Sequence, residues 1–158
     1  MSAPAHPLPR DGERNEPRGA GKTIQLGLGL SILGSTLAAF GPLLPWWKIT
    51  TRTLGIELHA VTGTEVWLGV VAFIAGVTAL GTCTYLYART ARKGSHGLVV
   101  LGAGAIAFVC AVIGAARGAW ILGTTFQVSS QIGILMSLVG GLITTVGGYL
   151  QTREGPER

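Results

Sequence analysis

Charged residues divide the chain into long apolar stretches. Asp, Glu, Lys, Arg and His are absent from residues 23–47, 66–88 and 97–116, and a fourth uncharged stretch covers residues 118–152. An α-helix rises about 1.5 Å per residue, so about 20 residues cross a hydrocarbon core of about 30 Å. The pattern therefore predicts an all-α integral membrane protein, a bundle of four transmembrane helices over residues 23–44, 66–88, 97–116 and 132–150. Uninterrupted stretches of this kind exclude a membrane β-barrel, whose strands alternate in hydrophobicity.

The composition excludes an ordinary water-soluble domain. Of the 158 residues, 12% are charged and 48% are hydrophobic, and the mean hydropathy is +0.50. A soluble domain has about 25% charged residues. Residues 1–22 contain four prolines and hardly any large apolar side chain, which predicts a disordered cytoplasmic tail. Residues 151–158 are expected to form a second, short cytoplasmic tail, and the first span is expected to be retained because it has no clean A-x-A cleavage site.

Basic residues beside the spans indicate how the protein is oriented, because they accumulate on the cytoplasmic side. That side would hold nine of the twelve Lys and Arg residues: Arg10, Arg14, Arg18, Lys22, Arg89, Arg92, Lys93, Arg153 and Arg158. The other side would hold Lys48, Arg52 and Arg117. Both termini are therefore predicted to be cytoplasmic, with outer loops 45–65 and 117–131 and an inner loop 89–96.

The aromatic residues predict the same orientation independently, since Trp and Tyr concentrate at membrane interfaces. Each Trp falls at a predicted outer end and each Tyr at a predicted inner end: Trp46, Trp47, Trp67 and Trp120, against Tyr85, Tyr87 and Tyr149. The net charge of +5 is then explained by orientation and by contacts with anionic lipid head groups of the bilayer. No nucleic acid partner is expected.

Small residues repeat every fourth position in each predicted span, which puts them on one helix face and allows close helix approach. The rows are Gly27, Ser31, Ser35, Ala39; Ala75, Ala79, Cys83; Ala103, Ala107, Ala111, Ala115; and, in the last span, Gly133, Ser137, Gly141, Thr145 beside Gly140, Thr144, Gly148. These rows predict packing within one bundle, and the alternative is that one row of the last span faces another subunit. Cys83 and Cys110 lie at different depths, so no disulfide is expected and both are interpreted as packing residues.

The first outer loop carries the main polar feature of the sequence. Residues 48–54 are β-prone, Gly55 permits a turn, and the next six residues alternate, which predicts a small β-hairpin. Its second strand would place Ile56 and Leu58 on one face and Glu57 and His59 on the other. Pro42 and Pro45 are expected to end the first span.

Two local contacts are predicted around this loop. Residues 62–65 match a capping box that would open the second span. Arg117 is predicted to pair with Glu57 or Glu65, or to stack on a Trp ring such as Trp120.

No residue pattern indicates an enzyme, a metal site or a cofactor. The predicted spans contain no ionisable side chain of the kind that pumps and membrane enzymes use. Glu57, His59 and Glu65 lack the partner set of a metal site. No catalytic, cofactor or metal residue is therefore expected.

Four short elements resemble those of small bacterial tetraspan membrane proteins of unknown function, the tryptophan-operon-associated membrane protein type. They are Leu44-Pro45-Trp46-Trp47, the Gly63-to-Trp67 entry to the second span, the basic turn 89–93 and the Gly-rich last span from Gly133 to Gly148. The resemblance covers residues 23–153. It implies a four-span architecture and a bacterial cytoplasmic membrane, and it implies no activity.

The predicted function is that of a non-enzymatic accessory or interaction subunit that binds another membrane protein, or a second copy of itself, through its outer loops. The candidate interaction residues are Trp46, Trp47, Glu57, His59, Glu65, Trp67, Arg117 and Trp120. The alternative is an oligomeric small channel or transporter with a path lined by Ser31, Ser35, Thr78, Thr82, Thr144 and Thr145. A membrane enzyme using Glu57, His59, Glu65 and Arg117 is disfavoured, because no Asp, Glu, Lys, Arg or His lies within the spans.

Overall fold

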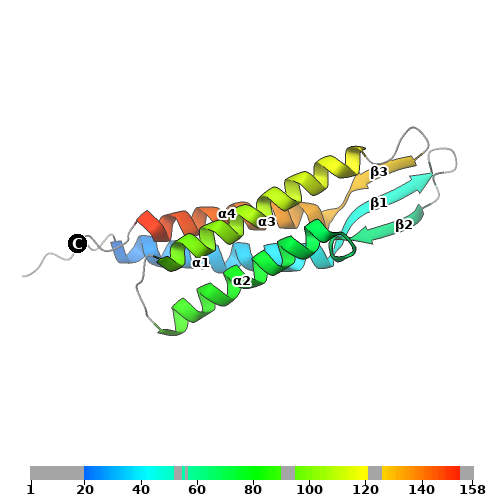
Figure 1. The fold of residues 1–158 in the computed structure, drawn as a ribbon. Helices are drawn as coiled ribbons and strands as arrows, with labels where there is room; N and C mark the ends of the chain where they lie inside the picture. The colour runs from blue at the N-terminus through cyan, green and yellow to red at the C-terminus, as the bar shows by residue number, and fades with distance from the viewer. Residues whose placement is uncertain (1–19, 52–54, 56, 90–94, 121–125, 154–158) are drawn as a thin grey trace, which may run out of the picture.

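Four long helices and a small sheet make up the protein. The computed structural model describes residues 20–51, 55, 57–89, 95–120 and 126–153 (Figure 1). The helices are α1 (Ala20–Phe40), α2 (Trp67–Arg89), α3 (Ser95–Trp120) and α4 (Ile132–Arg153), and the strands are β1 (Pro45–Thr51), β2 (Glu57–Thr62) and β3 (Phe126–Ser130). All four helices are long and apolar enough to cross a membrane, which confirms that part of the sequence prediction. We call the end that carries the strands the sheet end and the other the opposite end.

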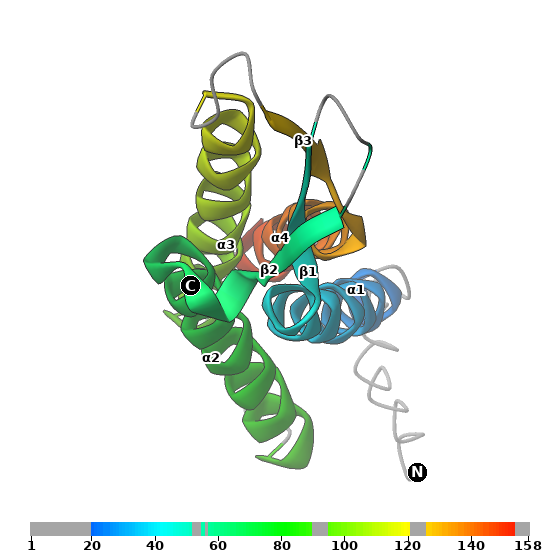
Figure 2. The same cartoon turned by 90° about the vertical axis from the view of Figure 1, so that its right-hand side faces the viewer.

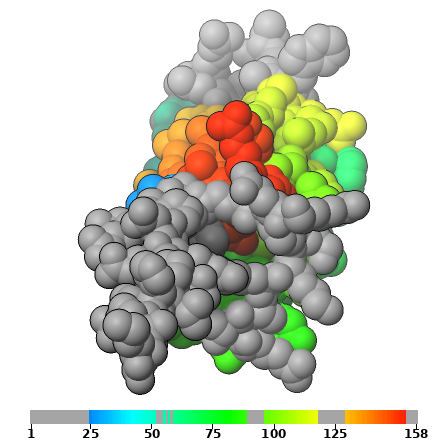
Figure 3. All heavy atoms as spheres, turned by 90° about the vertical axis from the view of Figure 1, so that its left-hand side faces the viewer, coloured from blue at the N-terminus to red at the C-terminus, as the bar shows by residue number. Residues whose placement is uncertain are grey.

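The helices form a closed ring of neighbours. Helix α4 packs along α1 on one side and along α3 on the other, and α2 completes the ring by contacting both α1 and α3. Figure 2 shows this arrangement from the sheet end, and Figure 3 shows α4 between α1 and α3 at the opposite end. Helix α2 barely contacts α4. Helix α4 is therefore shared between two large interfaces.

Glycines on two faces of α4 allow both of these interfaces to close. A Cβ at Gly140 would lie 2.7 Å from the carbonyl oxygen of Gly34 in α1, and a Cβ at Gly141 would lie 2.7 Å from the backbone N of Phe108 in α3. The backbones therefore approach more closely than any side chain would permit. Both predicted small-residue rows of α4 pack within the chain: their residues are buried except Thr145, which is half-buried against Gly104 of α3. The alternative that one row faces another subunit is contradicted.

Alanines fill the interfaces that involve α2. A buried cluster joins α1, α2 and α3, consisting of Ala38, Ala75, Ala79, Ala103 and Ala107. Cys83 and Cys110 are also buried and are not bonded to each other, which confirms their interpretation as packing residues.

The first helix ends where the prolines predict. Helix α1 stops at Phe40, a single 3₁₀ turn (Gly41–Leu43) contains Pro42, and β1 begins at Pro45. Strands β1 and β2 are antiparallel, and Gly55 between them has a φ of +63°, which a glycine adopts without strain. The predicted hairpin is therefore present. The predicted alternation at Ile56 and Leu58 concerns side chains outside the described set.

The third strand corrects the sequence prediction. Residues 117–131 were expected to form a loop, but α3 continues to Trp120 and β3 pairs antiparallel with β1 along its whole length. The strand order is β2-β1-β3. The segments that precede α2 and α4 therefore contribute to one sheet, because β3 pairs with the edge of β1 that β2 leaves free. The predicted disorder of residues 1–22 concerns a segment that is described only from Ala20 onward, where α1 begins.

Candidate interaction surface at the sheet end

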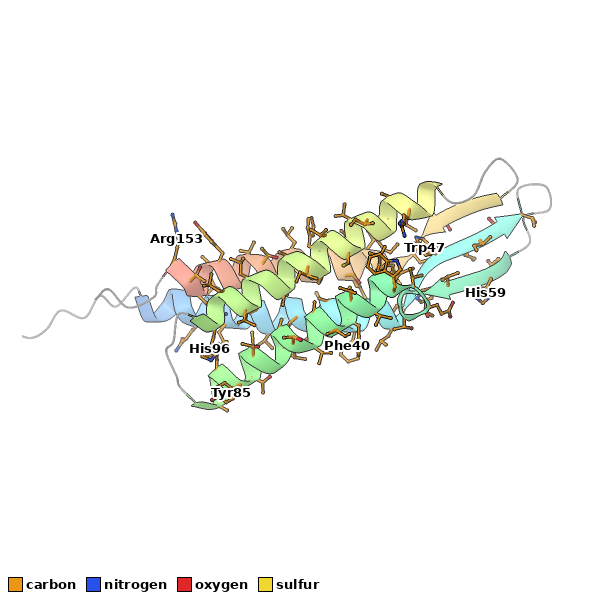
Figure 4. All side chains as sticks on the ribbon, in the orientation of Figure 1. Phe40, Trp47, His59, Tyr85, His96 and Arg153 are labelled. Atoms are coloured by element: carbon orange, nitrogen blue, oxygen red, sulfur yellow. The ribbon has the colours of Figure 1, made fainter. Side chains whose placement is uncertain are left out.

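Two adjacent tryptophans join the sheet to the helices. Trp46 is 0% exposed and Trp47 is 8% exposed, and their rings meet edge to face at a centroid distance of 6.1 Å. They form the core of an apolar cluster with Leu68, Cys110 and Ile134. Figure 4 shows Trp47 at the junction between β1 and the helices. Trp46 and Trp47 therefore belong to the core, and the prediction that they form part of an outer contact surface is corrected.

Glycines make room for Trp46. A Cβ at Gly63 would lie 2.5 Å from the indole Nε1 of Trp46, and a Cβ at Gly114 in α3 would lie 2.6 Å from its Cζ3. The Nε1 donates a hydrogen bond to the carbonyl oxygen of Gly41 at 3.3 Å. The Trp47 Nε1 is buried with no hydrogen-bond partner among the described residues. Two buried indole rings therefore anchor the sheet. The N–H of Trp46 is hydrogen-bonded, and the N–H of Trp47 has no hydrogen-bond partner among the described residues.

Charged side chains are gathered on β2 and the turn that follows it. Glu57 forms an ion pair with Lys48 of β1, and His59 Nε2 lies 3.6 Å from Glu65 Oε2. Glu57 and His59 side chains are each 65% exposed, and Figure 4 shows His59 on the outward side of β2. Exposed pairs of this kind contribute about 0–1 kcal/mol to stability. These residues are available for contacts, and the fold does not depend on them.

The predicted capping box does not form. Thr62 Oγ1 donates to Glu65 Oε1 at 3.2 Å and accepts no hydrogen bond from a backbone N–H of the turn, and α2 begins only at Trp67. The intervening residues form a 3₁₀ turn (Gly63–Glu65) in which the Val66 N–H bonds to the Gly63 carbonyl oxygen. Residues 63–65, which a capping box would place in the first turn of α2, form this separate 3₁₀ turn instead.

The remaining predicted residues lie around the same end. Trp67 is 63% exposed at the start of α2, and Arg117 is exposed near the end of α3. Among the described residues, Glu57 is paired with Lys48 and Glu65 with His59, and neither carboxylate is paired with Arg117 as predicted. The Trp120 side chain lies outside the described residues. Lys48 was missed as a partner, although its place opposite the second strand of the hairpin could have indicated it.

The hydroxyl groups proposed for a channel do not share one path in the single chain. Thr78 donates to the Ile74 carbonyl oxygen and Thr144 to the Gly140 carbonyl oxygen, each at 2.8 Å. Ser31 is instead buried and accepts a hydrogen bond from Gln151 of α4 at 2.9 Å. Thr78 is exposed on α2, whereas Ser31 and Thr144 are buried between α1 and α4. Across the described ranges, no group of three His, Cys, Asp or Glu residues could hold a metal ion.

The sequence was compared with protein family models and with curated proteins. No family model matches the sequence, and no curated protein matches it.

Proposed function

We propose that this protein is a multi-pass membrane protein of the bacterial cytoplasmic membrane, with both termini in the cytoplasm. In this proposal it is a non-enzymatic accessory subunit that binds another membrane protein through the sheet end. The bundle supplies the anchor and the sheet supplies the recognition surface.

The distribution of exposed side chains supports membrane insertion. Large apolar side chains are exposed along the outer faces of all four helices, among them Leu33, Ile74, Ile106 and Leu142. In water such an area would be strongly unfavourable, whereas lipid solvates it. Exposed Trp67 lies at the sheet end, and Tyr85, Tyr87 and Tyr149 are exposed toward the opposite end. Aromatic residues at both ends of an apolar body fit two membrane interfaces.

Cysteine labelling tests the orientation. The natural cysteines are buried, so the unmodified chain should not react with a membrane-impermeant maleimide. Thr64 and Arg153 are both exposed, at the sheet end and at the opposite end respectively. We expect T64C to be labelled in intact cells and R153C to be labelled only after the membrane is permeabilised.

Two other labelling results would contradict the proposed orientation. Labelling of R153C alone in intact cells would reverse the proposed topology. Equal labelling of both variants in sealed cells would contradict the single proposed orientation.

The observation that carries the binding proposal is the polar set on β2 and its following turn. Glu57, His59 and Glu65 are exposed, face outward and contribute little to the fold. They are held on a sheet whose base is fixed by the buried Trp46. A rigid support for exposed polar groups favours specific recognition, because little conformational freedom is lost on binding.

Copurification tests the binding proposal. The chain is extracted from its native membrane in a gentle detergent, and the associated proteins are identified by mass spectrometry. We expect a stoichiometric membrane protein partner with the unmodified chain. The triple variant E57Q/H59Q/E65Q should lose it, because two carboxylate charges and the imidazole are replaced by neutral amides at the interface.

Two controls make this result specific. R153Q changes an exposed charge at the opposite end and should keep the partner. The triple variant should unfold at nearly the same temperature as the unmodified chain. A chain that carries no partner, or a triple variant that keeps it, contradicts the proposal.

A further inference from the structure

The side of β3 that faces away from β1 has no partner strand among the described residues. Strand β3 lies at one end of the sheet order β2-β1-β3. Its pairing with β1 runs through five residue pairs without a register shift. In an antiparallel pair, successive residues alternately bond to the partner strand and direct their N–H and C=O groups away from it. The free side of β3 therefore carries a regular row of backbone donors and acceptors.

One hydrogen bond fixes which residues form this row. The Gln131 N–H donates to the Trp46 carbonyl oxygen at 2.9 Å, and the register places the next bonded pair at Ser129 and Lys48. The residues that alternate with the bonded ones direct their backbone groups outward, and they are Phe126, Val128 and Ser130. We call this row the outer edge of β3. Its members follow one another at about 7 Å, which is the spacing that a further strand presents in return.

The corresponding edge of β2 is protected against strand pairing. A register shift interrupts β2 opposite Ile49 and Thr50, and the side chains of Glu57 and His59 are exposed on this strand. Bulges and charged side chains keep edge strands from pairing. Strand β3 has neither a register shift nor a charged residue. Of the two edges, the outer edge of β3 is therefore the one suited to pairing.

Symmetry argues against a second copy of this chain as the occupant. The strands extend from the bundle roughly along the direction of the helices (Figure 1). Antiparallel pairing of two outer edges needs a two-fold axis perpendicular to the sheet, which would point the second bundle in the opposite direction. Parallel pairing about a two-fold axis would set each N–H opposite another N–H. Neither arrangement joins two copies in one membrane.

The chemistry of the edge favours an extended segment of another protein. Helix α1 begins and α4 ends at the opposite end (Figure 1), so the terminal segments lie across the proposed membrane from β3. Ser129 and Ser130 are exposed, and successive strand residues face opposite sides of the sheet. Each side of the edge thus offers a hydroxyl group and no charge. Ser and Thr pair favourably across strands, so an uncharged segment with hydroxyl side chains fits best.

We propose that the outer edge of β3 binds an extended, uncharged segment of another protein as a fourth strand of the sheet. Strand addition of this kind supplies main-chain hydrogen bonds that hold the partner. This inference rests on the proposed function, because it specifies how the partner at the sheet end is bound.

Two neighbouring serines provide matched variants for a test. Proline removes a backbone N–H, and an edge strand tolerates proline where that N–H faces away from the sheet. S130P removes an outward N–H and should leave the unfolding temperature nearly unchanged. S129P removes an N–H that the register directs toward Lys48, and it should lower the unfolding temperature. S130A changes the same side chain as S130P and keeps the N–H.

The first measurement is hydrogen–deuterium exchange resolved to single residues. It compares the complex copurified from native membranes with the chain after its partner has been removed. In the chain alone, we expect the N–H groups of residues 127 and 129 to exchange slowly and those of residues 126, 128 and 130 to exchange fast. In the complex, the N–H groups of residues 126, 128 and 130 should become slow as well, because the partner strand accepts from them.

The second measurement is the amount of partner that copurifies with each chain. S130P should carry at least about fivefold less partner than the unmodified chain, since an acceptor in the partner strand loses its donor. S130A should carry the unmodified amount. The exchange pattern needs no variant, so it decides the question even where S130P is unstable.

Three outcomes would overturn the inference. A partner that leaves residues 126, 128 and 130 unprotected, or that S130P retains, would show that the edge is not used, and the proposed function would then stand without it. A homo-oligomer of the unmodified chain that S130P separates would assign the edge to a second copy. A chain that carries no partner at all would remove both this inference and the binding proposal.

Discussion

Replacing Gly140 by alanine is expected to lower the free energy of unfolding by about 2–3 kcal/mol, in the upper part of the range for overpacked cores. The added methyl group would lie 2.7 Å from the carbonyl oxygen of Gly34 and would also meet the backbone N of Ala38. Backbone atoms cannot turn aside as a flexible side chain does, so α1 and α4 must separate. The measurement is denaturant unfolding in detergent, followed by circular dichroism.

Gly29 provides the matched control for this prediction. It lies in α1, and a Cβ there would meet nothing within 4 Å. Alanine is the better helix former, so G29A should leave the unfolding free energy unchanged or raise it by up to about 1 kcal/mol. If G140A and G29A had equal effects, close backbone approach between α1 and α4 would not be a source of stability.

Replacing Trp46 by alanine should cost about 3–5 kcal/mol of unfolding free energy, as for other large aromatic side chains removed from a core. Trp46 is wholly buried, and its Nε1 is bonded to the Gly41 carbonyl oxygen. Its removal leaves a cavity at the junction between the sheet and the helices. Limited proteolysis should then cleave W46A within residues 45–65 faster than the unmodified chain.

Three further substitutions separate burial from hydrogen bonding. W67A removes an exposed ring at the same end and should change stability by less than about 0.5 kcal/mol. W46F keeps most of the volume but loses the bond to Gly41, whereas W47F removes an indole N–H that has no partner among the described residues. W46F should therefore destabilise more than W47F. Equal effects of W46A and W67A would show that the junction does not hold the sheet.

The four helices and the hairpin could be predicted because their signals are local. An apolar stretch of membrane-spanning length indicates a helix by itself. The strands β1 and β2 are adjacent in sequence, and the segment that joins them contains Gly55. Glycine is a turn signal because it adopts a positive φ without strain, as Gly55 does. Strand β3 could not be predicted in this way, because five partly polar residues form a strand only when distant β1 offers its free edge.

The candidate surface was predicted in part. Alternation in the second strand correctly indicated that Glu57 and His59 are exposed. The burial of Trp46 depends on Gly63 and Gly114, which lie in different elements and meet only in the folded chain. The predicted pairing of Arg117 missed that Lys48 lies on the strand next to Glu57, where the two side chains form an ion pair across the hairpin.

The packing of α4 against both α1 and α3 has a consequence for folding during synthesis. Chains emerge from the ribosome N-terminus first, and the helix that packs along both α1 and α3 is the last to be synthesised. Strand β3 also arrives late, so β1 has one unpaired edge until then. A chain stopped before Phe126 would lack both β3 and α4, which would leave the glycine face of α1 uncovered and the sheet incomplete. A chain terminated before Phe126 should therefore be removed by membrane proteases and should not form a smaller working protein.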